Sequence, residues 1–141
     1  MKSILVIAVV VRLLPHAAAA QAYAETGVEV TPIVQTDTTA AGTPFAYPRT
    51  GDAEITALVV EIPAGAETGR HLHPQPTFVY VLEGTLEVEA DDGTVRTFHP
   101  GDGFVEVVNT WHNGRNAGAT PVRVLVVFAG ARGEPNVVRP E

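Results

Sequence analysis

The sequence predicts an all-β domain, built as a sandwich or a barrel. Short runs of strand-forming residues recur at regular spacing from residue 53 onward, and glycine and proline mark the turns between them. No segment carries a sustained helical period. A chain of 141 residues suits one such domain and leaves little room for a second.

The first 22 residues are typical of an export signal. Lys2 supplies a basic start, and the apolar run Ile4–Val11 is too short to cross a bilayer, which takes about 20 residues. Arg12 interrupts that run, and the alanines up to Ala22 offer small-residue cleavage sites. We therefore expect a signal peptide at 1–22 and a periplasmic or secreted protein that has no membrane contact after cleavage.

The expected barrel has an arm before it and a tail after it. The region 23–50 is rich in Thr, Ala and Pro and contains one β-like run, Val28–Val34. We predict that 23–50 is an N-terminal arm, that 51–130 is the barrel, and that 131–141 is an exposed C-terminal tail.

Six strands are expected in the barrel from local patterns. In the run LEVEA, apolar and acidic residues alternate, which is the period-two pattern of a half-exposed strand. Asp92-Gly93 suits a hairpin turn that needs a positive φ, and Pro100-Gly101 suits a second tight turn. The other runs are short, β-branched and bounded by glycine or proline. The expected strands are 55–62, 78–83, 85–90, 94–99, 103–108 and 121–128.

Composition excludes several classes of function. The chain has no cysteine, so it cannot hold a disulfide, a thiolate zinc site or a cysteine nucleophile. Its formal net charge of −7 leaves no basic stripe for a phosphate backbone, so we expect no nucleic-acid partner.

Histidines provide the clearest functional signal. His71 and His73 are two residues apart, and on an extended chain their side chains project to the same face. His112 follows downstream, on what we expect to be a neighbouring strand. Sites made only of imidazoles suit iron, copper, nickel or zinc, so this pattern indicates a metal site. Arg70 and Arg115 flank these histidines and are either contacts for an anionic substrate or solvated surface groups.

The same residues resemble the cupin superfamily. The histidine pair and Gly84 fall in register with the first cupin motif, and the segment Pro100–Asn116, which includes His112, is similar to the second. The resemblance implies a single-domain cupin jelly-roll β-barrel. It also implies a metal bound by the two motif-one histidines, a motif-one Glu and the motif-two histidine. Single-domain cupins are usually dimers, so the resemblance implies a homodimer.

One position departs from the family pattern, because Thr77 stands where the first motif has its Glu. Three neutral imidazoles would leave the charge of about +2 on a divalent ion without a compensating carboxylate. Glu106, on the strand before His112, is then either a further metal ligand or a group that orients the substrate or a water. Gln75 is a third, weaker candidate ligand. Alternatively, Thr77 marks a cupin barrel that binds no metal.

From this site we expect a mononuclear dioxygenase that acts on a small enol-, diketone- or catechol-like substrate. An ion held by neutral ligands favours substrates that chelate as anions, and cupin dioxygenases that lack the Glu also use three histidines. His71, His73 and His112 would hold Fe²⁺, or else Mn²⁺, Ni²⁺, Zn²⁺ or Cu²⁺, while Glu106 accepts a proton and Thr77 donates a hydrogen bond. The alternatives are a non-catalytic periplasmic cupin that binds a metal or small ligand, and a Lewis-acid sugar isomerase or lyase.

Overall fold

The computed structural model describes residues 26–141 of the chain. The expected signal peptide, 1–22, lies outside the described residues. The chain divides after Gln35, and the compact unit runs from Thr36 to Glu141. Before that division, the β-like run expected at Val28–Val34 forms no strand, and nearly all of its residues are exposed. Strand-forming side chains stabilise a strand only when they pack against a partner.

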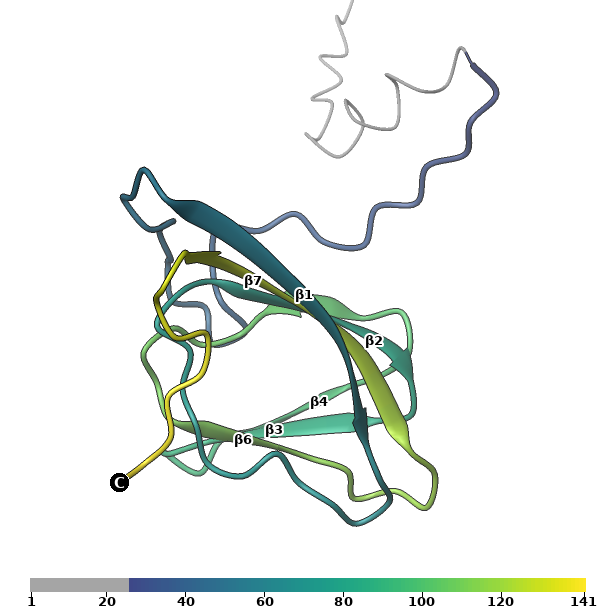
Figure 1. Cartoon of the computed structure of the whole chain (residues 1–141). Helices are drawn as coiled ribbons and strands as arrows, with labels where there is room; N and C mark the ends of the chain where they lie inside the picture. The colour runs from purple at the N-terminus through teal and green to yellow at the C-terminus, as the bar shows by residue number, and fades with distance from the viewer. Residues whose placement is uncertain (1–25) are drawn as a thin grey trace, which may run out of the picture. The chain divides into compact units, whose positions relative to one another are not determined.

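The compact unit is an all-β jelly-roll barrel made of two antiparallel sheets, which face each other in Figure 1. The described residues contain seven strands and no helix. The strands of the first sheet, in spatial order, are β1 (Ala53–Ile62), β7 (Val122–Ala131), β2 (Thr77–Glu83) and β5 (Gly103–Val105). Those of the second are β4 (Val95–Phe98), β3 (Leu86–Ala90) and β6 (His112–Arg115).

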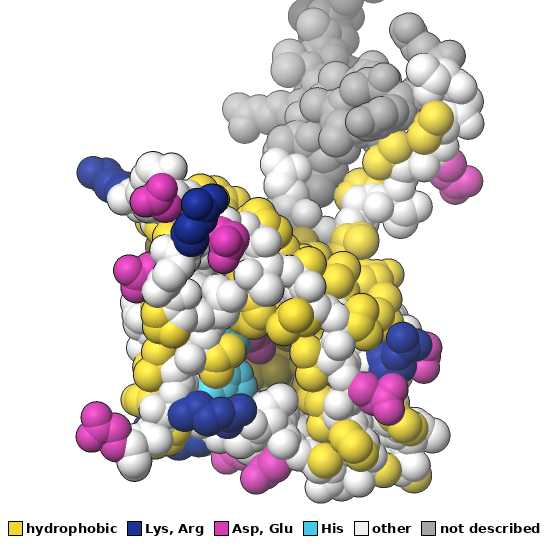
Figure 2. All heavy atoms as spheres, viewed as in Figure 1, with side chains coloured by type: hydrophobic (Ala, Val, Ile, Leu, Met, Phe, Trp, Pro, Cys, Tyr) yellow, Lys and Arg dark blue, Asp and Glu magenta, His cyan; other side chains and the backbone are white. Residues whose placement is uncertain are grey.

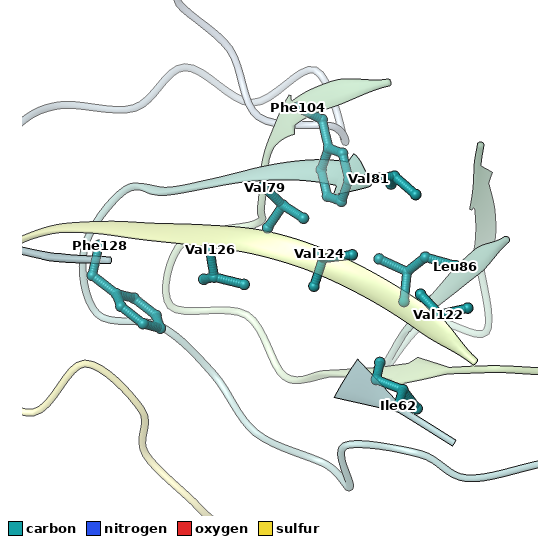
Figure 3. Close-up of a cluster of buried hydrophobic side chains, with 9 residues drawn as sticks. All are labelled: Ile62, Val79, Val81, Leu86, Phe104, Val122, Val124, Val126 and Phe128. Carbon is teal, nitrogen blue, oxygen red and sulfur yellow. The ribbon is translucent and has the colours of Figure 1, made fainter. Parts of the chain in front are cut away.

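The core lies between the sheets and is built mainly by β7 and β2. Along β7, buried and half-buried residues alternate over the whole strand, so every second side chain enters the interior. Figure 3 shows these side chains projecting from one face of the strand toward the opposite sheet. The core residues are Ile62, Val79, Val81, Leu86, Phe104, Val122, Val124, Val126 and Phe128.

Two expected boundaries differ from the structure. The strand expected at 103–108 ends at Val105, because the chain then turns to place Val108 in a bridge with His73. The tail expected from residue 131 is largely exposed, but its backbone is tied to the barrel: Val138 and Leu72 exchange two backbone hydrogen bonds of 3.0 Å. In the described part of the chain, no helix is long and apolar enough to cross a membrane.

Candidate metal centre

Backbone pairing brings the three histidines together from distant parts of the chain. His71 and His73 lie on the extended segment between β1 and β2, and His112 begins β6. His71 and His112 exchange backbone hydrogen bonds of 2.9 and 2.8 Å, and the carbonyl of His73 accepts one of 2.8 Å from Asn109. The ring centroids of the three imidazoles are then 4.5 to 5.1 Å apart.

Each imidazole is oriented by a backbone carbonyl at its Nδ1 atom. Nδ1 of His71 lies 2.7 Å from the oxygen of Gly69, and Nδ1 of His112 lies 2.8 Å from that of Thr110. Nδ1 of His73 lies 2.8 Å from the oxygen of Asn136. A carbonyl oxygen only accepts, so each Nδ1 carries a proton, and a ring in its neutral form then presents the lone pair of Nε2.

The remaining ring nitrogens fit a metal ion. One ligand atom from each of the three buried histidines lies within 4.8 Å of the others, so the group could hold a metal. Nε2 of His112 is buried and has no hydrogen-bond partner within the described residues. A buried polar atom without a partner is costly, and an ion at this point would satisfy it. Backbone carbonyls behind the ligand rings are the usual support of a histidine metal site.

Glu106 faces the same point from the end of β5. Its carboxylate lies 2.9 Å from Nε2 of His73 and 3.7 Å from Nε2 of His112. Because the lone pair of His73 Nε2 faces a carboxylate, a positive charge is needed between them, either a proton or a metal ion. Glu106 does not belong to the candidate metal-binding group, whose ligand atoms lie within 4.8 Å of one another and come only from the three histidines.

The pKa shifts follow from burial and from this pairing. Burial alone would raise the pKa of Glu106, but the facing imidazoles of His112 and His73 outweigh it and hold the pKa at about 2. Burial likewise opposes the charged form of His112, but the Glu106 carboxylate more than offsets it and raises the pKa of His112. Burial lowers the pKa of His71, which favours the neutral form that a metal ligand requires.

A cavity of about 200 Å³ opens beside these groups. His71, His73 and Glu106 line one part of it, and most of the remaining wall is apolar, including Val79 and Phe128. In Figure 2, histidine and acidic side chains are visible inside a hollow on this face of the molecule. The volume equals that of about seven waters at ~30 Å³ each, so the cavity suits a small, largely apolar molecule.

Thr77 and Gln75 are placed differently from the histidines. Thr77 is fully buried and shares the inward face of β2 with Val79, but its hydroxyl donates a 3.2 Å hydrogen bond to the carbonyl of Gln75. Neither Thr77 nor Gln75 is among the residues that line the cavity. The amide nitrogen of Gln75 instead donates hydrogen bonds of 2.7 Å to the Asn136 side chain and 3.2 Å to the Pro135 carbonyl.

The two arginines that flank the histidines are engaged elsewhere. Arg70 forms an ion pair with Asp91 and stacks over Trp111, and Arg115 pairs with Glu87 and with a second carboxylate on β3. Neither arginine lines the cavity beside the histidines.

Sequence reasoning missed three residues of this site, all in the expected tail. Val137 and Arg139 line the cavity, and the Asn136 carbonyl orients His73. The only local signal was the apolar pair Val137-Val138 in an otherwise polar segment.

Comparison with known proteins assigns the chain to a family. Residues 58–128 match the model of the Cupin domain. An uncharacterized conserved protein with a double-stranded β-helix domain from Klebsiella pneumoniae is 20% identical, with 68% of this chain and 92% of that chain covered and a TM-score of 0.52. At that identity the likeness concerns the fold alone. Among curated proteins, none matches the chain.

Two enzymes are among the similar solved structures. An oxalate decarboxylase is 25% identical over 60% of this chain and 23% of its own, with a TM-score of 0.51. A sugar phosphate isomerase of the cupin superfamily from Silicibacter pomeroyi is 30% identical over 53% of this chain and 50% of its own, with a TM-score of 0.48. The chain therefore spans half of the isomerase and less than a quarter of the decarboxylase.

Proposed function

This chain belongs to the cupin family, and from that premise we propose that it is a metal-dependent dioxygenase acting on a small chelating anion. Nε2 of His71, His73 and His112 would hold one divalent ion, with Fe²⁺ the preferred metal. When bound, such an ion would supply a cationic centre with open positions for an oxygen-donor substrate and for O₂. The observation that carries the proposal is the buried Nε2 of His112, which has no hydrogen-bond partner within the described residues and which a metal ion would satisfy.

Glu106 has one of two roles in this proposal. Its carboxylate lies beside the imidazoles of His73 and His112, where it can accept hydrogen bonds from a bound group. If it stays clear of the ion, it accepts a hydrogen bond from the hydroxyl of an enol or catechol substrate and orients the oxygens that chelate. If it moves toward the ion, it replaces the missing motif-one carboxylate.

The cavity supports a small substrate. Its apolar wall, with Val79, Val126 and Phe128, offers sugar hydroxyls no hydrogen-bond partners and so favours an unsubstituted hydrocarbon portion over a hydroxylated sugar. This is the physical reason to prefer diketones and catechols to sugars as substrates.

The test combines metal analysis with oxygen uptake. We expect about one ion per chain in the purified protein, and loss of that ion together with a lower melting temperature in His112→Ala, because an ion that binds only the folded state stabilises it. His99→Ala is the matched control, since the His99 side chain is exposed and its only hydrogen-bond partner among the described residues is Thr85. The iron-loaded protein should then consume O₂ with a member of a diketone and catechol panel.

Each outcome bears on a different part of the proposal. Full metal occupancy in His112→Ala would contradict the ligand assignment. Retained metal with altered activity in Glu106→Gln would assign Glu106 to the substrate, and lost metal would make it a ligand. A metal-loaded protein that consumes no O₂ with any member of the panel would refute the dioxygenase. A reaction without O₂ would be the second candidate, and the similarity to an oxalate decarboxylase favours carboxylic acids as the first substrates to test for it.

A further inference from the structure

The C-terminal strap, which we define as residues 134–139, is bonded to the segment that carries two of the histidines. The carbonyl of Asn136 accepts a hydrogen bond from Nδ1 of His73, and Val138 pairs with Leu72 in an isolated β-bridge. At the end of the strap, Nη1 of Arg139 donates a 3.0 Å hydrogen bond to the carbonyl of Thr68. The strap is therefore attached at three successive points along the rim of the site.

Two side chains of the strap form part of the cavity wall. Val137 and Arg139 line the cavity together with His71, His73 and Glu106, and both strap residues are exposed to solvent. A residue that touches both the cavity and the solvent lies at its mouth. Arg139 thus lies where a substrate passes from water to the metal centre.

The guanidinium of Arg139 has bonding capacity to spare. Of the residues that line the cavity, Arg139 is the only Lys or Arg. Three other arginines of the barrel, Arg70, Arg115 and Arg123, pair with carboxylates, whereas Arg139 has no ion-pair partner among residues 26–141. Its one hydrogen bond, to Thr68, uses one of five N–H donors.

From this arrangement we propose that Arg139 binds a carboxylate of the substrate at the cavity mouth, so that the preferred substrates are small carboxylic acids whose other oxygens, such as those of a diketone, chelate the ion. This inference rests on the proposed function, because it takes the other end of the substrate to chelate the ion. A planar guanidinium matches a carboxylate through two parallel hydrogen bonds. The inference narrows the proposed substrate class from any chelating anion to an anion that carries a carboxylate besides its chelating oxygens.

The charges of the site agree with such a substrate. The divalent ion contributes about +2, Glu106 contributes −1 and Arg139 contributes +1, while the three imidazoles are neutral. A substrate with one negative charge at the ion and a second at the arginine compensates this sum, whereas a singly charged chelator leaves the guanidinium unpaired.

The test measures binding rather than turnover, with zinc-loaded protein, since zinc has no redox chemistry. The two probes are acetylacetone, a diketone that chelates as its enolate, and 2,4-dioxopentanoate, the diketone with a carboxylate added. We expect wild type to bind 2,4-dioxopentanoate at least tenfold more tightly by calorimetry. Arg139→Met should remove that preference, so that the two probes bind with similar affinity, while zinc content stays unchanged because the strap supports His73 through a backbone carbonyl.

Controls separate the possible failures. Arg132→Met removes another exposed arginine near the C-terminus, one that does not line the cavity, and should keep the wild-type preference. Arg139→Lys keeps the charge without the paired donors, should bind 2,4-dioxopentanoate with intermediate affinity, and serves if Arg139→Met does not fold. Two results would overturn this inference and leave the proposed function standing. Zinc-loaded wild type could bind both probes with equal affinity, or the preference could survive in both Arg139 variants. A protein that binds no metal would overturn the proposed function together with this inference.

Discussion

At the scale of single residues, the site depends on which nitrogen of each imidazole is left free. Gly69 and Thr110 each orient the histidine two residues further along, so His71 and His112 are set by their own local turns. His73 is different, because its partner Asn136 lies 63 residues away in sequence. The geometry of two of the imidazoles is therefore local, and that of the third depends on the docked C-terminus.

Thr77 offers a direct test of the missing carboxylate. Its side chain lies on the inward face of β2, and its carbonyl accepts a 2.9 Å hydrogen bond from the backbone N–H of Glu106, so a Thr77→Glu side chain would enter a buried region that already holds an anion. We expect metal-free Thr77→Glu to be less stable than wild type by about 2 kcal/mol or more, since a buried charge needs a partner. With metal, the new carboxylate should raise affinity at least tenfold. Chemical denaturation and competition with a chelator measure the two effects, and Thr77→Gln is the neutral control. An unchanged metal affinity would show that residue 77 does not reach the ion.

At the scale of elements, the turn after β2 is constrained by the start of β7. Gly84 has a φ of +75°, and a Cβ there would lie 2.7 Å from the Pro121 carbonyl oxygen and 2.9 Å from Cα of Val122. Gly93 has a similar φ of +81° in the turn after β3, but a Cβ there would meet nothing within 4 Å. A side chain at either glycine would therefore have the same conformational cost, and only at position 84 would it also clash with the backbone of another strand.

We expect Gly84→Ala to lower the free energy of unfolding by about 3 kcal/mol and Gly93→Ala by only about 1 kcal/mol. Urea denaturation of both variants isolates the difference, which is the cost of the clash with β7. Equal losses at the two positions would mean that the β2 turn moves freely and that close approach to Pro121 is unimportant.

How far the sequence predicts the elements depends on the range of the interactions that form them. The strand β3 could be predicted because apolar and acidic residues alternate along its sequence, a pattern that consecutive residues show by themselves. The register of β6 and the attachment of the strap could not, because His71 pairs with His112 and Leu72 with Val138 across long sequence separations. The meeting of the histidines was expected from their motif spacing, whereas the role of Arg139 has no sequence pattern at all.

At the scale of the whole molecule, β1 leaves an open sheet edge. It is an outer strand of ten residues in the order β1-β7-β2-β5, and β7 is its only partner strand in the described part of the chain. Ile55 and Val59 on its outward face are 66% and 58% exposed, and the strand interior between Glu54 and Glu61 carries no charge. Exposed edges of this kind pair with other chains unless charged residues or proline protect them.

We therefore predict that two copies of the chain pair through β1, which would extend the four-stranded sheet across both molecules. Val59→Lys places a charge at the centre of that edge and should convert a dimer into a monomer in sedimentation experiments at micromolar concentration. Val95→Lys is the control, because Val95 is 42% exposed on β4 of the other sheet and should leave the dimer intact. A monomeric wild type, or a Val59→Lys variant that stays dimeric, would rule out this edge as the interface. Because Leu58, Val60 and Ile62 of the same strand line the cavity beside the histidines, monomeric Val59→Lys should also be assayed for metal content, which we expect to be unchanged.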